Sequence, residues 1–196
     1  MTITSANTCQ RADRYRLLSD CYYLPDAQLV QRITDAVRTD PLFADLACCV
    51  PGALELEALK IDFASLFVGP YELLAPPYGS VYLEDDRVMG DSTIDVGNCY
   101  ASEGLDITIK DAPDHIAVEL EFMHYLAVRQ MEATRRANLQ AIQRYQQKQY
   151  SFLQTHLARW LPEFADNVRE NARTAFYKHL AQITAVFVRE DLGACT

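Results

Sequence analysis

Residues 76–91, Pro-Pro-Tyr-Gly-Ser-Val-Tyr-Leu-Glu-Asp-Asp-Arg-Val-Met-Gly-Asp, separate two blocks of sequence that both have helical spacing. The two prolines fix the backbone and remove two N–H donors, so a preceding helix must end before them. Gly79 permits a bend, and Tyr78 and Tyr82 supply apolar faces with polar tips. The stretch predicts a rigid aromatic loop. It is either a docking place for a basic, apolar partner or an ordinary connection between helices.

Acidic residues are concentrated around this stretch. Residues 81–121 contain 11 acidic and 2 basic side chains, so their net charge of −9 equals that of the whole chain. A focused negative field argues against nucleic acid as a partner and favours a cationic one. Residues 122–196 have a net charge of +4 instead, and this basic half could meet the acidic middle within the fold.

The composition is that of a globular protein. The 196 residues fit one domain, and 49% of them are apolar while 23% are charged. Apolar runs are far shorter than the roughly 18–20 residues of a membrane-spanning helix. Residues 1–7 lack a basic start followed by an apolar run, so they do not resemble a secretory signal. We expect a soluble protein that is not exported.

The six cysteines form no Cys-x-x-Cys pair and have no histidines at zinc-finger spacing. They are Cys9, Cys21, Cys48, Cys49, Cys99 and Cys195. We expect free thiols in a reducing compartment, packed as small apolar side chains. The chain is therefore expected to hold neither a structural metal nor an iron–sulfur cluster.

Apolar residues recur at intervals of three and four through most of the chain, which predicts an all-α fold. The expected helices cover residues 8–23, 26–38, 41–49, 53–67, 92–103, 113–135, 136–157, 163–172 and 173–190. Pro162 is expected to break the chain between two helices, and residues 104–113 are expected to form an extended linker. The expected N-terminal caps are Thr8, Asp40 and either Asp91 or Ser92.

The strongest helical pattern, residues 113–135, has two polar side chains on its apolar face. His115 and Glu119 project there and are four residues apart, so their side chains can touch. If they pair, the pKa of His115 rises and the pKa of Glu119 falls. The pair either supports the neighbouring loop or lines a groove beneath it. A catalytic dyad is a third reading, but no nucleophile accompanies it at fixed spacing. Asp114 projects on the opposite face, which is expected to be in water.

Several short motifs resemble the signature segments of the TorD/DmsD family, the chaperones that mature molybdenum-containing redox enzymes. They are Pro76-Pro77-Tyr78-Gly79-Ser80-Val81-Tyr82, Gly90-Asp91-Ser92-Thr93, Tyr100 with Glu103-Gly104, Pro113-Asp114-His115-Ile116 and Trp160-Leu161-Pro162-Glu163-Phe164. They occur in the family's order and cover most of residues 55–190.

The resemblance implies a single TorD-like domain, residues 1–196, folded as a bundle of about eight to ten helices. An N-terminal half, residues 1–103, would be joined to a C-terminal half, residues 114–196, through a hinge at 104–113. Some family members exchange halves between protomers. The resemblance therefore implies a monomer that is able to form a domain-swapped dimer.

The resemblance also implies a system-specific chaperone in the cytoplasm, and not an enzyme. It would bind the twin-arginine signal peptide of a molybdenum-containing oxidoreductase and assist its folding, cofactor insertion and proofreading before export. The implied partners are that leader, the body of the catalytic subunit and proteins of molybdenum-cofactor biosynthesis. Neither nucleic acid nor insertion into a membrane is implied. No cofactor is implied beyond weak GTP binding, since guanine nucleotides have been associated with the family.

A basic and apolar leader needs an acidic rim beside an aromatic groove, because arginine pairs with carboxylates in bidentate geometry. The expected rim is Glu84, Asp85, Asp86, Asp91 and Asp114. The expected groove is Leu73, Leu74, Tyr78, Tyr82, Phe122 and Met123. Together with the resemblance, this gives a predicted peptide-binding set of Pro76, Pro77, Tyr78, Gly79, Ser80, Tyr82, Asp114, His115, Glu119, Phe122 and Met123.

Two other functions are compatible with the sequence. One is a NarJ-like chaperone or scaffold for a molybdoenzyme that is not exported. The other is a nucleotide hydrolase, which has less support because the chain has no Gly-x-x-x-x-Gly-Lys loop and its acidic centre repels phosphates.

Overall fold

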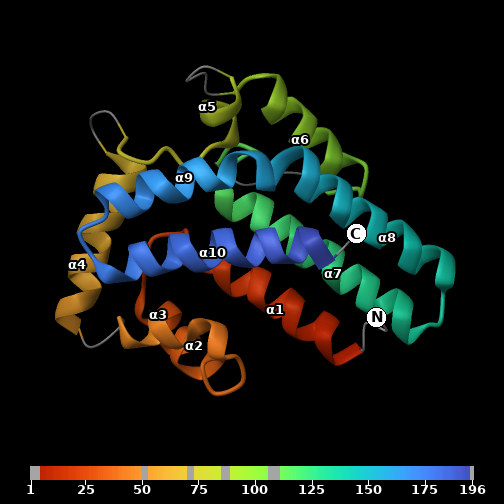
Figure 1. Cartoon of the computed structure of the whole chain (residues 1–196), viewed down its shortest axis with the longest axis horizontal. Helices are drawn as coiled ribbons and strands as arrows, with labels where there is room; N and C mark the ends of the chain where they lie inside the picture. The colour runs from red at the N-terminus through yellow and green to blue at the C-terminus, as the bar shows by residue number, and fades with distance from the viewer. Residues whose placement is uncertain (1–4, 50–52, 70–72, 85–88, 106–110, 195–196) are drawn as a thin grey trace.

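The protein is a bundle of helices in the computed structural model, which describes residues 5–49, 53–69, 73–84, 89–105 and 111–194 (Figure 1). In chain order the helices are α1 (Ser5–Cys21), α2 (Ala27–Ala36), α3 (Ala44–Cys48), α4 (Ala53–Phe63), α5 (Gly79–Leu83), α6 (Asp91–Ala101), α7 (Ile116–Arg135), α8 (Leu139–Phe152), α9 (Ala158–Asn171) and α10 (Ala175–Ala194). A 3₁₀ turn, Pro41–Phe43, precedes α3, and π-helical turns follow α4 (Ala64–Val68) and α8 (Leu153–Leu157). The all-α prediction is confirmed, with no strand in the described ranges.

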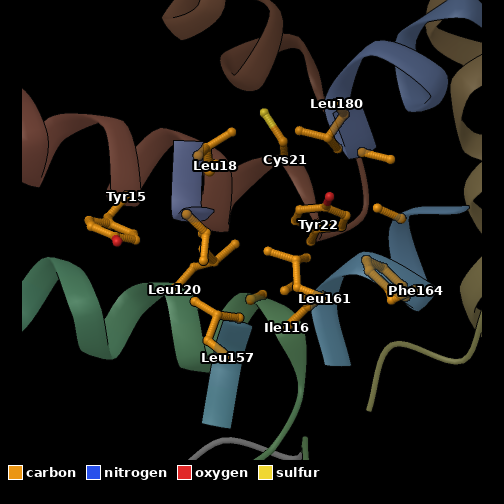
Figure 2. Packing of buried hydrophobic residues seen from close by; sticks show 14 of the residues in the cluster. Tyr15, Leu18, Cys21, Tyr22, Ile116, Leu120, Leu157, Leu161, Phe164 and Leu180 are labelled. Carbon is orange, nitrogen blue, oxygen red and sulfur yellow. The ribbon is translucent and has the colours of Figure 1, made fainter. Parts of the chain in front are cut away.

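The core lies where α1, α7, α9 and α10 meet. Leu18 of α1, Leu120 of α7, Leu161 of α9 and Leu180 of α10 are each at most 1% exposed, and Figure 2 shows them converging on one cluster. Fully burying one such side chain stabilises the fold by about 1.5–3 kcal/mol. These four long elements form the body on which the shorter helices rest.

Two of the predicted N-terminal caps are wrong and one is confirmed. Asp40 caps the turn that leads into α3, because its carboxylate accepts a hydrogen bond from Leu42 N at 3.1 Å. Thr8 lies inside α1, which is already helical at Ser5. The residue preceding α6 is Gly90, so neither Asp91 nor Ser92 is its cap.

The predicted break at Pro162 is wrong, since this proline lies inside α9. A proline cannot donate to the carbonyl four residues earlier, here that of Ala158. Two features make this tolerable. The Pro162 side chain is exposed to solvent, so its ring displaces no side chain of the core. The π-helical turn Leu153–Leu157 directly precedes α9 and changes the local winding of the helix.

The predicted linker at 104–113 is only partly within the described residues, because 106–110 lie outside them. Gly104 lies three residues after the end of α6 and has a φ of 73°, and its N–H donates to the carbonyl of Ala101 at 2.9 Å. On the other side, α7 begins at Ile116 and not at the predicted Pro113. The hinge role of this segment stays a prediction.

Candidate functional site

The Pro-Pro-Tyr-Gly and Pro-Asp-His segments are joined by backbone hydrogen bonds. Tyr78 and His115 form an isolated antiparallel bridge, in which Gly79 N donates to the Asp114 carbonyl and Ile116 N donates to the Pro77 carbonyl, both at 2.9 Å. We call this contact, residues 77–80 with 113–116, the junction. It fixes the start of α5 against the start of α7.

Asp114 is part of the inside of the junction. Its side chain is 1% exposed, and Oδ2 accepts a hydrogen bond from Ser80 N at 2.8 Å, which caps the first turn of α5. The predictions that Asp114 faces water and belongs to an acidic rim are therefore wrong. The helical projection failed because α7 begins at Ile116, three residues after the predicted start, so Asp114 is not helical.

His115 caps α7 and joins two tyrosine rings. Its Nδ1 accepts a hydrogen bond from Ala117 N at 3.2 Å, so the neutral ring has its proton on Nε2. The imidazole stacks on Tyr23, with centroids 6.1 Å apart and planes 14° apart, and meets Tyr78 edge-on at 5.3 Å. Burial lowers the pKa of His115, although the charges of Asp111 and Asp114 act in the opposite direction.

Glu119 does not pair with His115. It is 1% exposed, and its Oε2 accepts a hydrogen bond from the indole Nε1 of Trp160 at 3.3 Å. Burial raises the pKa of Glu119 well above its usual value. Both pKa directions are opposite to those predicted for a pair. The spacing rule did not apply because His115 has non-helical backbone angles, φ −68° and ψ 135°.

The expected loop after the prolines contains the short helix α5, which rests on α9. Gly79 lies so close to Trp160 that an added Cβ would be 2.8 Å from the indole Nε1. At the other end of α5 the Tyr82 ring stacks on the same indole, with centroids 5.6 Å apart and planes 21° apart. Ser80 is buried between them and accepts a hydrogen bond from Met89 N through Oγ at 3.3 Å.

Two of the residues predicted to line the groove belong to the core. Phe122 is 5% exposed and Met123 is fully buried. The Phe122 ring packs against Tyr100 and Phe152, with centroids 4.6 and 4.9 Å away, so α6 and α8 cover this part of α7. Their predicted contact with a peptide is therefore wrong.

The remaining predicted groove residues differ in exposure. Leu73, Pro76, Tyr78 and Tyr82 are half-buried, Pro77 is buried and Leu74 is 42% exposed. None of these residues lines the groove of ≈ 380 Å³ that lies between α9 and α10, whose walls include Arg169, Glu170 and Lys178.

The residues predicted to form an acidic rim have different roles: one caps a helix, and another is exposed to solvent. Glu84 caps α6, because its carboxylate accepts hydrogen bonds from Asp91 N at 2.9 Å and from Ser92 N at 2.6 Å. Gly90 makes room for it, since a Cβ there would lie 1.8 Å from Glu84 Oε2. Asp91 is exposed, and Asp85 and Asp86 lie outside the described residues.

The basic C-terminal half does meet the acidic middle at one position. Glu103 lies 2.7 Å from Arg144 and 2.5 Å from Lys148, both of α8. Burial acts to raise the pKa of Glu103, but the hydrogen bonds from these two side chains, together with their charges, lower it. The negative field open to a partner is reduced accordingly.

Two residues that sequence analysis missed complete the outer face of the junction. Tyr23 follows α1 and is half-buried, and burial together with the charges of Glu121 and Asp111 raises its pKa to about 12. The charge of Asp111 also acts on Tyr78 and His115. The Tyr22-Tyr23 pair before Pro25 was the available signal, but only the fold shows that Tyr22 is buried and Tyr23 is not.

The described residues contain no group of three or more His, Cys, Asp or Glu side chains placed to hold a metal ion. Within the same ranges, no helix has the length and apolar character needed to cross a membrane.

In fold the molecule is similar to a helical protein of redox-enzyme maturation. The solved structure of a redox enzyme maturation protein from Archaeoglobus fulgidus superposes with a TM-score of 0.55 over 93% of this chain and 92% of that one, at 23% identity. At that identity the likeness shows the fold alone.

Sequence comparison assigns the family. The model described as nitrate reductase delta subunit matches residues 27–166, so the chain belongs to this family. A chaperone protein TorD of Vibrio parahaemolyticus is 30% identical over 68% of this chain and 62% of its own length. The match therefore spans somewhat less than two thirds of that relative. The resemblance to the TorD/DmsD proteins is confirmed.

Two further relatives match over more of the chain. A perchlorate reductase assembly chaperone protein of Dechloromonas aromatica is 26% identical over 93% of this chain and 88% of its own. A Tat proofreading chaperone DmsD of Salmonella typhi is 28% identical over 83% and 78%. Their names are those of chaperones, the class that the sequence predicts, and not those of enzymes.

Proposed function

We propose that this protein is a cytoplasmic chaperone that binds the basic and apolar N-terminal leader of a molybdenum-containing oxidoreductase. The names of the TorD, DmsD and perchlorate reductase assembly relatives support this proposal. A leader held by the chaperone would not meet the export machinery until the client has folded and received its cofactor. Proteins of molybdenum-cofactor biosynthesis would then be further partners.

The observation that carries the proposal is the outer face of the junction. Half-buried Tyr23 and Tyr78 contact His115, and the carboxylate of Asp111 is close enough to affect all three rings. Asp111 forms no ion pair with any described residue, whereas Glu103, Asp40 and Asp191 are held by the protein's own cations. An arginine of the leader can lie on a tyrosine ring and pair with Asp111, a contact of about 0.5–2 kcal/mol for the ring alone.

Two exposed apolar side chains belong to the same two chain segments as these tyrosines. Leu24, the residue after Tyr23, is 63% exposed, and Leu74, just before the prolines, is 42% exposed. Leader residues that follow the arginines would pack on such side chains, at roughly 25 cal/mol per Å² before the cost of ordering the peptide. The junction therefore offers the combination of ring, carboxylate and apolar surface that such a leader requires.

Calorimetry with a synthetic leader that contains two adjacent arginines tests the proposal. We expect a Kd in the micromolar range or tighter, about −8 kcal/mol, that weakens as salt is added. Asp111→Asn should weaken binding about three- to tenfold. The matched control is Asp45→Asn on α3, which removes an exposed carboxylate with no ion-pair partner in the described residues. Absence of binding at large peptide excess, or equal effects of the two variants, would contradict the proposal.

A second candidate function follows from the family description. The matching model is named for a nitrate reductase delta subunit, which favours a NarJ-like chaperone for a molybdoenzyme that is not exported. A leader in which both arginines are replaced by glutamine separates the two functions. A twin-arginine chaperone should lose most of its affinity for this peptide, while a NarJ-like chaperone should bind the apolar part almost unchanged.

A further inference from the structure

Glu119 and Trp160 lie beneath α5, on the inner side of the proposed leader site. Glu119 belongs to α7 and Trp160 to α9, and each side chain is 1% exposed. The indole Nε1 donates to Glu119 Oε2 at 3.3 Å. A carboxyl buried this deeply cannot contact a peptide on the surface, so its effect on the site must pass through another side chain.

Trp160 provides that route, because its ring supports both ends of α5. Gly79, the first residue of α5, lies against the indole nitrogen, and a Cβ at this position would be only 2.8 Å from it. Tyr82, one residue from the end of α5, stacks on the same ring system. A five-residue helix is not stable alone, so its orientation depends on what it rests on.

We infer that Glu119 is a positioning residue for the leader site: it accepts the indole N–H, fixes the Trp160 ring, and through that ring fixes α5 and the exposed edge of Tyr78. The inference rests on the proposed function, since the surface that α5 presents is the proposed leader site. It gives Glu119 a role different from the peptide contact that the sequence suggested.

The proton of Glu119 is part of this arrangement. Burial raises its pKa well above the usual value, and the charge of Asp114 adds to the effect, while the bond from Trp160 opposes it. The other titratable groups around it are Cys99 and Tyr100 of α6, which both feel its charge, and His115, whose pKa is lowered. None of them supplies a positive charge at neutral pH. Ionised Glu119 would therefore be a buried, uncompensated charge at the contact that holds Trp160.

The sign of the pH effect follows from the raised pKa. A carboxyl whose pKa is higher in the folded than in the unfolded protein contributes stability below the unfolded pKa and loses it as pH rises through the folded pKa. The contact between Glu119 and Trp160 should therefore weaken as the pH rises through the folded pKa of Glu119.

Trp160 is the only tryptophan of the chain, so its fluorescence reports on this contact directly. In the full-length protein we expect the emission to shift as pH is raised and Glu119 ionises. Glu119→Gln keeps a hydrogen-bond acceptor but cannot ionise. It should abolish this shift and bind the synthetic leader as the unaltered protein does. Glu119→Ala removes the acceptor and should move the emission to longer wavelengths and raise the leader Kd about tenfold.

Two pairs of variants distinguish a specific effect on the position of the Trp160 ring from a general loss of structure. Glu132→Gln, also on α7 but only half-buried and paired with Arg129, should change neither emission nor binding. Gly79→Ala should move the indole from its other side and shift the emission, whereas Gly193→Ala, where a Cβ meets nothing within 4 Å, should not.

The inference fails if Glu119→Gln keeps the alkaline shift, or if Glu119→Ala leaves both emission and binding unchanged. If the circular dichroism of Glu119→Ala shows a loss of helix, the pH titration of Trp160 emission in Glu119→Gln tests the inference by itself. If the unaltered protein binds no leader, the proposed function fails, while the emission titration still tests the contact between Glu119 and Trp160.

Discussion

At the scale of single residues, the polar side chains of the motifs mainly form hydrogen bonds within the protein. His115 accepts from Ala117 N, Asp114 accepts from Ser80 N, and Glu119 accepts from Trp160. Each of these bonds satisfies a donor that would otherwise be buried without a partner, which costs about 1–3 kcal/mol. The parts left for a ligand are the edges of Tyr23 and Tyr78 and the carboxylate of Asp111.

The depressed pKa of His115 predicts a loss of stability in acid. Its folded pKa lies below the unfolded value of 6.5, so its contribution is present above about pH 6.5 and is lost as pH falls through the folded pKa. Urea unfolding at pH 7.5 and 5.5 should show this loss in the unaltered protein and less of it in His115→Asn. An asparagine can still accept from Ala117 N, whereas His115→Ala should cost about 1 kcal/mol at pH 7.5. An identical pH dependence in all three proteins would contradict the assignment to His115.

At the scale of elements, the site is made by short segments whose geometry depends on their neighbours. α5 has five residues and receives its cap from Asp114, its support from Trp160 and its connection to α6 through Glu84. The helices of the body are long enough to be read from apolar periodicity. Isolated helices this short are marginal in water, so α5 exists because of the contacts it makes.

Removing the Glu84 carboxylate should loosen the start of α6. Glu84→Ala deletes the acceptor for Asp91 N and Ser92 N and should lower the free energy of unfolding by about 1 kcal/mol in urea titrations. Glu84→Gln keeps one oxygen acceptor and should lose less. Glu57→Ala on α4 serves as control, since Glu57 is exposed and pairs with Lys60 at the surface, and it should change stability by less than about 0.5 kcal/mol. Equal effects of Glu84→Ala and Glu57→Ala would exclude the capping role.

At the scale of the whole molecule, the first and last helices are tied together near the ends of the chain. Arg11 of α1 forms an ion pair with Asp191 of α10, and Tyr15 Oη donates to the same carboxylate at 2.6 Å. The Arg11 guanidinium also donates to Gln149 of α8 at 2.5 Å. Figure 1 shows α1 and α10 in the body of the bundle, with α5 and α6 together on one side of it.

Breaking this connection should destabilise the entire fold. Asp191→Ala removes the largely buried carboxylate that pairs with Arg11 and should lower the free energy of unfolding by about 3 kcal/mol. Asp166→Ala removes an exposed carboxylate paired with Arg169 and should cost less than about 1 kcal/mol. Chemical denaturation followed by circular dichroism measures both. A cost below 1 kcal/mol for Asp191→Ala would show that α1 and α10 are held by apolar packing alone.

The all-α class and most of the long helices were predictable because apolar side chains recur at helical spacing. The predicted ranges 26–38 and 53–67 correspond to α2 and to α4 with its π-helical turn. Errors arose where one residue type was read alone. Residue type alone predicts a break at Pro162 and caps at Thr8 and Asp91, but each of these residues lies inside a helix. Solvent exposure and a preceding π-helical turn decided the first case, and neither is visible in a local pattern.

The sequence by itself determined the all-α class and marked the Pro-Pro-Tyr-Gly and Pro-Asp-His motifs, because periodicity and motifs are both properties of residue order. Only the tertiary structure decided what their residues do. Asp114 and Glu119 turn inward, and Phe122 and Met123 join the core. Tyr23, which follows α1 and is far from the motifs in sequence, lies against His115. The physical reason is that burial depends on contacts between residues far apart in the chain. Burial in turn raises the pKa of Glu119 and fixes which rings stay open to a partner.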